Sequence, residues 1–119
     1  MDKKEFLISK GVDAETAIEN MMGMDIYDEM IHDYMESLPN DFNTLINYKN
    51  TGDIANYAIQ VHAMKSNARS FGFMKLGEIA YAHEMKSKEN DVAFINEHFG
   101  ELESAVNEVE AILEEYKNL

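Results

Sequence analysis

Apolar residues along this chain recur with the spacing of amphipathic helices, and no stretch alternates with period two for long. The segment from about Asp53 to Ser70 shows this best, with its stripe at Ile54, Tyr57, Ala58, Val61, Met64, Ala68 and Phe71. From Asn90 onward the apolar residues follow steps of four and three, at Ile95, Phe99, Leu102, Val106, Val109, Leu113 and Tyr116. That heptad pattern is typical of a long helix packed nearly antiparallel in a bundle.

Glycine, proline and capping residues divide the pattern into six predicted helices, over residues 14–20, about 25–36, about 39–49, 53–70, 74–86 and from 90–91 onward. We expect Asp13, Asp25 and Asp53 as N-caps and Gly52 and Gly72 as helix ends. Pro39 suits the first turn of a new helix, so we expect an interruption at Ser37-Leu38-Pro39.

Short connections make successive helices antiparallel neighbours. The predicted fold is therefore all-α, an up-and-down antiparallel four-helix bundle with one or two short additional helices. We expect a single domain over residues 1–119. The initial methionine and the compact span favour a free-standing protein slightly over a domain of a larger one.

The composition excludes several classes of function. The formal net charge is -13, whereas binding to nucleic acid or to an anionic membrane surface needs a basic face. The chain has no cysteine, which rules out disulfides, thiolate catalysis and zinc sites built on cysteine. The N-terminus is too polar for a secretory signal and no run suits a membrane helix, so we expect a cytoplasmic protein.

His62 is the main candidate for chemistry. It lies about 100° from the centre of the buried stripe of its helix, at the edge of the exposed face, with Lys65 and Ser66 one turn further on and Arg69 two turns on. Five of the ten basic residues fall between His62 and Lys88. A neutral imidazole beside cations and a hydroxyl is suited to accept a phosphoryl group, although an ordinary solvated helix face explains the charges equally well.

The motif around His62 resembles that of the histidine-containing phosphotransfer (HPt) domain family. The family pattern consists of H-x-x-K-G, a glycine ten residues after the histidine, and L-x-x-x-A-x-x-L-E. This chain resembles it with His62, Lys65, Gly72, Leu76, Ala80 and Glu84 at the matching positions. Gly11-Val12-Asp13, Leu38-Pro39 and Gly52-Asp53 resemble further family positions.

The resemblance implies a phosphorelay carrier that moves a phosphoryl group between the aspartates of response-regulator receiver domains. His62 would be phosphorylated through Nε2, and Lys65, which we expect to be largely exposed, would neutralise the phosphoryl charge. Ser66, Arg69 and Gly72 would belong to the binding surface, with Gly72 at the helix end near it. The chain would need no cofactor or metal, because the receiver supplies Mg²⁺. A hybrid sensor kinase is a further possible partner.

The chain departs from the family pattern at three positions. Ser66 stands in place of glycine, where a side chain narrows the clearance for a partner, and Asn67 stands where a small residue is common. His83 stands where leucine is usual; a packed or half-exposed helix histidine is its simplest interpretation, and a role in proton transfer or phosphoryl contact is the alternative. Ser66 and Asn67 motivate a second hypothesis, a non-catalytic helical adaptor that binds receivers without transferring phosphate.

Other motifs give weaker evidence of function than the one around His62. Glu29-x-x-His32 resembles half of a di-iron bundle motif, but the chain has no second copy, so we expect no metal site. His98 is most simply a surface residue. The residues Met64, Phe71, Phe73 and Met74 are core candidates, some of which would alternatively border His62 as an apolar docking patch.

Overall fold

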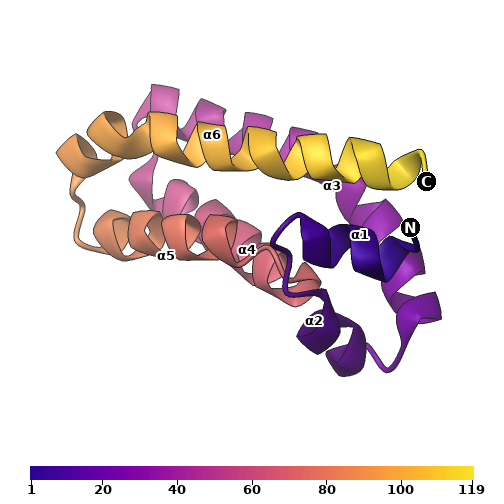
Figure 1. Cartoon of the computed structure of the whole chain (residues 1–119). Coiled ribbons are helices and arrows are strands. Elements are labelled where there is room, and N and C mark those ends of the chain that lie inside the picture. Colours follow the sequence, from indigo (N-terminus) through magenta and orange to yellow (C-terminus); the bar gives the residue numbers. More distant parts are fainter.

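The computed structural model describes all 119 residues as six helices joined by short turns (Figure 1). The helices are α1 (Lys3–Ser9), α2 (Ala14–Asn20), α3 (Met24–Thr51), α4 (Ile54–Phe71), α5 (Met74–Lys88) and α6 (Val92–Lys117). No helix is both long enough and apolar enough to cross a membrane. The all-helical fold class expected from the apolar spacing is confirmed.

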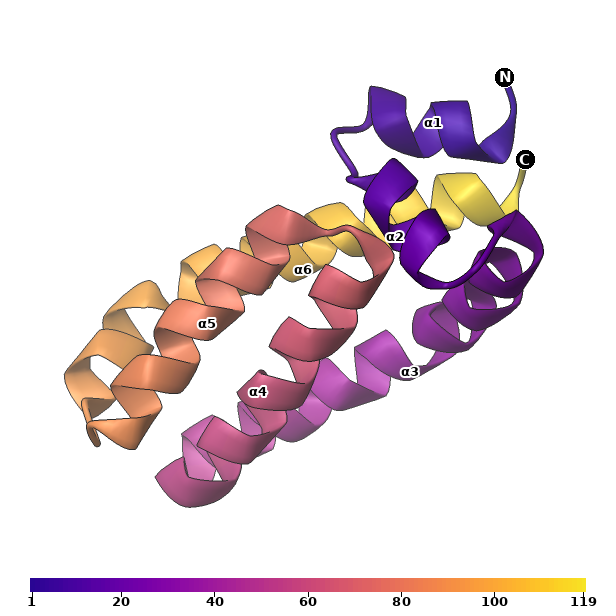
Figure 2. The same ribbon diagram turned by 90° about the horizontal axis from the view of Figure 1, so that it is seen from below.

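The four long helices form the bundle. Helices α3, α4, α5 and α6 pack in sequence order, and α6 also contacts α3, which closes the bundle (Figures 1 and 2). The apolar stripe predicted for α6 is buried except for Phe99, which is partly buried against the core. Each fully buried apolar side chain contributes about 1.5–3 kcal/mol, so this shared core holds the four helices in register.

The predicted interruption at Ser37-Leu38-Pro39 is wrong, because Pro39 does not break the helix. Residues 24–51 form one continuous helix with Pro39 inside it. A proline inside a helix costs about 3 kcal/mol, because it lacks an N–H and its ring crowds the preceding turn. Leu38 and Phe42, on either side of it, are 1% and 7% exposed, and Tyr34 and Leu45 extend the same buried face. Burial on both sides of Pro39 outweighs the local cost, so the helix runs through.

The start of α3 also differs from the prediction. Gly23 is its N-cap and Asp25 lies in the first turn, where a carboxylate still favours the positive end of the helix dipole. The spacing of Ile26, Tyr27, Met30, Ile31 and Tyr34 predicts one apolar face, but Ile26 and Met30 are each 45% exposed. The inward face is narrower than the sequence indicates and carries mainly Tyr27, Ile31 and Tyr34.

Helix α1 has no counterpart among the predicted helices. Asp2 caps it by accepting a hydrogen bond from the backbone N–H of Glu5, and Phe6 and Leu7 are buried. Seven residues are too few to form a stable helix alone, so the burial of these two side chains supplies what local propensity does not. Helices α1 and α2 lie together at one end of the bundle, near both chain termini (Figure 1).

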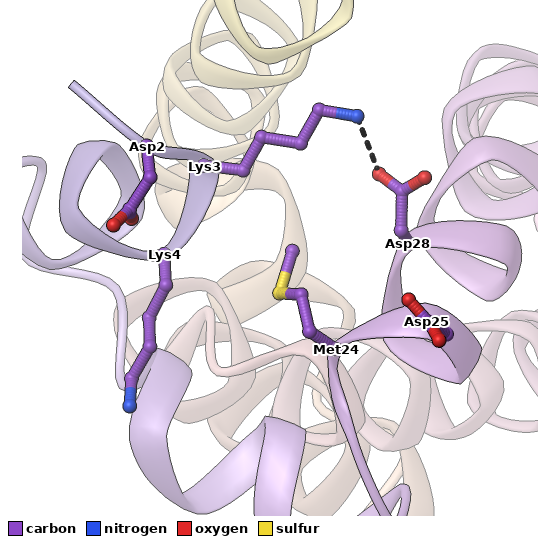
Figure 3. Close-up of a pocket in the computed structure, with 6 residues that line it drawn as sticks. All are labelled: Asp2, Lys3, Lys4, Met24, Asp25 and Asp28. Atoms are coloured by element: carbon purple, nitrogen blue, oxygen red, sulfur yellow. Dashed lines mark hydrogen bonds and ion pairs between the residues drawn. The ribbon is translucent and has the colours of Figure 1, made fainter.

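Polar contacts attach this N-terminal pair to the bundle. Lys3 Nζ lies 3.0 Å from Asp28 Oδ1, above a hollow between α1 and α3 that is also lined by Met24 (Figure 3). The Tyr116 hydroxyl donates to the same Asp28 oxygen at 2.6 Å. This Tyr116 bond is the main reason why the pKa of Asp28 is lowered. Asp28 therefore joins α1, α3 and α6 at one point.

Gly72 forms a second junction. It ends α4 in the left-handed conformation with φ +91° and its carbonyl accepts a hydrogen bond from the Asp13 N–H at 2.9 Å. A Cβ at Gly72 would lie 2.5 Å from the Asp13 carbonyl oxygen, so only glycine fits. Asp13 precedes α2 as predicted, but its side chain makes no capping bond, whereas Asp53 does cap α4.

Candidate functional site

His62 lies in the middle of α4 with 56% of its side chain exposed, as its position on the helix predicted. Its helix is held in place by the buried stripe on the opposite face, which includes Tyr57, Val61 and Met64. The imidazole therefore stands on a rigid element with one side open to solvent.

A buried carboxylate on the neighbouring helix holds the His62 ring. Glu84 of α5 is 2% exposed, and its Oε2 lies 2.6 Å from His62 Nδ1. Its Oε1 accepts a hydrogen bond from Lys65 Nζ at 2.6 Å, and Lys88 Nζ lies 3.0 Å from Oε2. Two ammonium groups and one imidazole thus surround a single carboxylate between α4 and α5.

These partners keep Glu84 ionised. Burial by itself raises the pKa of the carboxyl, but the hydrogen bonds from Lys65, Lys88 and His62 outweigh burial and hold the pKa at about 2. An ionised carboxylate only accepts hydrogen bonds. Glu84 is therefore an acceptor at every pH at which the protein would work.

The charge of Glu84 determines which nitrogen of His62 carries the proton. Because Glu84 can only accept, the bond of 2.6 Å places the proton on Nδ1. Lys65 Nζ lies further from Nδ1, at 3.3 Å, and gives its hydrogen bond to the carboxylate instead. In a neutral ring with its proton on Nδ1, Nε2 carries a lone pair that can act as a nucleophile, and no group of the protein forms a hydrogen bond with it.

The expectation that Lys65 is largely exposed is wrong. Its side chain is 13% exposed, because the ammonium reaches Glu84 and lies 5.3 Å from the centre of the Tyr81 ring. The charge remains within one helical turn of His62, but it is partly neutralised by the carboxylate.

The other predicted binding residues are only partly brought together. Ser66 is exposed one turn from His62, and Asn67 is exposed beside a shallow depression that reaches Met30 of α3. Arg69 is exposed and lies over Tyr81. Gly72 is ten residues from His62, which is about 15 Å along a helix, and its contacts are with Asp13 rather than with the histidine.

Three of the four core candidates are core residues, so the alternative of a docking patch beside His62 does not hold for them. Met64, Phe71 and Phe73 are buried, and of the four candidates only Met74 is exposed, at the start of α5. The exposed apolar side chains near His62 are instead Ile59, one turn before it, and Tyr81 and Met85 on α5. The sequence pattern placed Ile59 outside the buried stripe but gave no reason to group it with α5.

The residues that sequence reasoning missed are those of α5. The sequence indicates Glu84 only through the family pattern and does not set Lys88 or Tyr81 apart from other helix residues. One signal was available, since Glu84 and Lys88 are spaced i, i+4 on a helix whose other charges are mostly basic. The meeting of that pair with His62 depends on how α4 and α5 align.

His83 is packed in the core, which is the simpler of its two interpretations. It is 1% exposed, its Nε2 lies 3.2 Å from the His98 carbonyl and its Nδ1 lies 2.9 Å from the Tyr57 hydroxyl. A carbonyl only accepts, so Nε2 carries the proton and Nδ1 accepts from Tyr57. Burial lowers the pKa of His83, in keeping with a neutral ring.

No group of three or more histidine, aspartate or glutamate side chains is arranged to hold a metal ion. His32 of the Glu29-x-x-His32 motif faces Asp28, at 3.8 Å, and the Tyr116 ring. Its neighbours thus belong to the junction between α3 and α6.

A solvent-exposed imidazole, oriented by a buried carboxylate on a helical bundle, has the arrangement expected of the class of proteins that carry a transferable group on histidine. Comparison with protein families agrees with this class. The Hpt domain matches residues 29–115, most of the chain, so the chain belongs to the Hpt domain family, whose members act in histidine phosphotransfer in phosphorelays. No curated protein and no solved structure gives a significant match.

Proposed function

We propose that this protein relays a phosphoryl group between receiver-domain aspartates through a phosphohistidine at Nε2 of His62. The observation that carries the proposal is the bond of 2.6 Å between His62 Nδ1 and the buried, ionised Glu84, which directs the proton of the neutral ring to Nδ1 and leaves Nε2 of this exposed side chain as the nucleophile. Hpt domains typically interact with receiver domains of two-component systems.

The chemical step needs only the carrier and its partner. The Nε2 lone pair attacks the phosphorus of an aspartyl phosphate, the bond from phosphorus to the carboxylate oxygen breaks, and the aspartate leaves with the electron pair. The imidazole ring, which keeps its Nδ1 proton, becomes positively charged. Glu84 faces that proton and stabilises the positive charge of the ring. When a second aspartate takes the phosphoryl group, the ring becomes neutral again.

In this proposal Lys65 supplies positive charge near the transferred group, and the receiver brings Mg²⁺ together with its aspartate. The exposed apolar side chains Ile59, Tyr81 and Met85 give the partner a surface to bury around His62. A hybrid sensor kinase that carries a receiver is a suitable donor. The cytoplasmic location stays a prediction, which fractionation of cells would check.

The test is incubation of the protein with a panel of phosphorylated receiver domains. We expect label on the wild type and none on His62→Gln, which removes the nucleophile and keeps a polar side chain. Lys65→Ala is expected to slow transfer, by about 10-fold to 100-fold, because it removes a charge-assisted interaction from the transition state. Labelling of His62→Gln would refute the proposal, and a normal rate for Lys65→Ala would remove Lys65 from it.

The adaptor hypothesis is tested in the same assay. Ser66 is exposed one turn beyond His62, where a docking partner would meet its side chain. Receiver binding without labelling, at an affinity that His62→Ala leaves unchanged, would favour an adaptor over a carrier.

A further inference from the structure

Arg69 stands apart from the other cations around His62. Four lysines between His62 and Lys88 each have a carboxylate partner within 4 Å. Their partners are Glu84 for Lys65 and Lys88, Glu108 for Lys75, and Glu89 for Lys86. Arg69 is the only arginine of the chain, which has 23 acidic residues, and none of them pairs with it.

Helix α5 holds Arg69 in a defined position. A Cβ at Gly77 would lie 2.8 Å from Arg69 Cγ, so the absence of a side chain at Gly77 makes room for the arginine stem. One turn along α5, the Tyr81 ring centre lies 5.3 Å from Arg69 Cζ. Gly77 and Tyr81 are spaced i, i+4 and together form a seat for the side chain. A seated guanidinium loses less entropy when it binds a ligand than a freely rotating one.

The guanidinium keeps its hydrogen-bonding capacity. Contact with an aromatic face leaves the N–H groups at the edge of the guanidinium plane available, and the Arg69 side chain donates no hydrogen bond within the protein. Two parallel N–H groups match the two oxygens of a carboxylate. The ligand that this arrangement fits is therefore a carboxylate supplied from outside the chain.

The place of Arg69 suggests which carboxylate it takes. It is seven residues from His62, about 10 Å along the helix, and Lys65 lies between them. At that distance Arg69 is better placed to contact the rim of a partner docked over His62 than to contact the phosphoryl group itself. A chain with net charge -13 repels an acidic partner, and one unpaired cation beside the site offsets this locally.

We propose that Arg69, seated on Gly77 and Tyr81, is a docking anchor that pairs with a carboxylate on the receiver domain bound at His62. This inference rests on the proposed phosphotransfer function and adds to it a determinant of partner choice. Receivers with a carboxylate at the matching rim position are then preferred over receivers that lack one.

The experiment uses the receiver domain that labels the wild type fastest. Its Kd is measured for the wild type, Arg69→Gln, Arg69→Lys and Lys75→Gln over a range of salt concentrations. Lys75→Gln is the matched control, because it removes the same charge from an exposed side chain that is paired with Glu108 on α6. We expect Arg69→Gln to raise Kd about tenfold at low salt and to flatten its salt dependence. Arg69→Lys should recover part of the loss, and Lys75→Gln should change Kd by less than about twofold.

Two further measurements separate the possible results. The lifetime of the phosphohistidine without partner should be the same in the wild type and in Arg69→Gln; a shorter lifetime with an unchanged Kd would mean that Arg69 contacts the phosphoryl group, and would overturn the anchor. Gly77→Ala, which displaces the arginine stem, should raise Kd when it is introduced into the wild type. It should leave Kd unchanged when it is introduced into the Arg69→Gln variant. Equal Kd values for the wild type, Arg69→Gln and Lys75→Gln overturn the anchor alone, whereas a panel in which no receiver labels the wild type overturns the proposed function as well.

Discussion

At the scale of single residues, one buried carboxylate organises the candidate site. Side chains of His62, Lys65 and Lys88 all contact Glu84, so three hydrogen-bond donors converge on one carboxylate. A buried charge without partners is unfavourable, so the same contacts that orient His62 also make the burial of Glu84 tolerable. The proposed function and the local stability of the site therefore both involve Glu84.

We predict that Glu84→Gln lowers the free energy of unfolding by about 2 kcal/mol near neutral pH, because it removes the charge that two ammonium groups surround. The folded pKa of Glu84, about 2, lies below its ordinary value of 4.5, so its ionised form stabilises the fold above about pH 4.5. That contribution is lost as the pH falls from there towards 2. Denaturant titrations at several pH values should show the difference between the two proteins shrinking over this range.

Glu78→Gln is the control for Glu84→Gln, since Glu78 is exposed on the same helix and makes no ion pair. It should change stability by less than about 0.5 kcal/mol. Glu84→Gln should also slow phosphotransfer, and nitrogen chemical shifts of His62 should show a weaker preference for the tautomer with the proton on Nδ1. An unchanged tautomer would contradict the role assigned to Glu84.

At the scale of helices, the sequence predicts most helices, but it does not predict where one helix continues into the next. Apolar spacing and the caps at Gly52, Asp53 and Gly72 located α4 to within a residue of its observed ends. Pro39 misled the prediction, because a local signal for a helix start was outweighed by burial of Leu38 and Phe42 on either side. Helix α1 is absent from the prediction because its local sequence offers only the Asp2 cap, and burial of Phe6 and Leu7 supplies the rest of its stability.

We predict that Gly72→Ala is much more destabilising than Gly52→Ala. Both glycines end helices at positive φ, +91° and +71°, so both substitutions carry the left-handed strain of about 1–2 kcal/mol. A Cβ at Gly52 meets nothing within 4 Å, whereas a Cβ at Gly72 meets the Asp13 carbonyl. Urea denaturation should give a loss of about 1 kcal/mol for Gly52→Ala and roughly 3 kcal/mol or more for Gly72→Ala. Equal losses would show that the contact with Asp13 does not constrain the junction.

At the scale of the whole molecule, the N-terminal helices are part of the folded unit, although the family match begins only at residue 29. Lys3, Asp28 and Tyr116 join α1, α3 and α6 at the end of the bundle where both chain termini lie (Figure 1). The Gly72 junction joins α2 to the end of the helix that carries His62. The N-terminal pair therefore supports the bundle from the end distant from Lys88.

We predict that Tyr116→Phe lowers the free energy of unfolding by about 1 kcal/mol, because it removes a hydroxyl that donates to Asp28. Since the lowered pKa of Asp28 depends chiefly on this bond, the difference from the wild type should narrow as Asp28 becomes protonated in acid. Tyr48→Phe is the control, since the Tyr48 hydroxyl has no hydrogen bond within the protein. Hydrogen exchange in α1 should accelerate in Tyr116→Phe and stay unchanged in Tyr48→Phe.

The sequence by itself determined the fold class, most helix boundaries and the exposure of His62, because apolar spacing and capping act over a few neighbouring residues. Only the tertiary structure decided that α3 continues through Pro39 and that Lys65 is nearly buried. It also decided that Glu84 of α5 sets the proton on His62, and that Gly77 and Tyr81 seat Arg69. These features depend on the alignment of α4 with α5, which the packing of the whole core determines and no local pattern encodes.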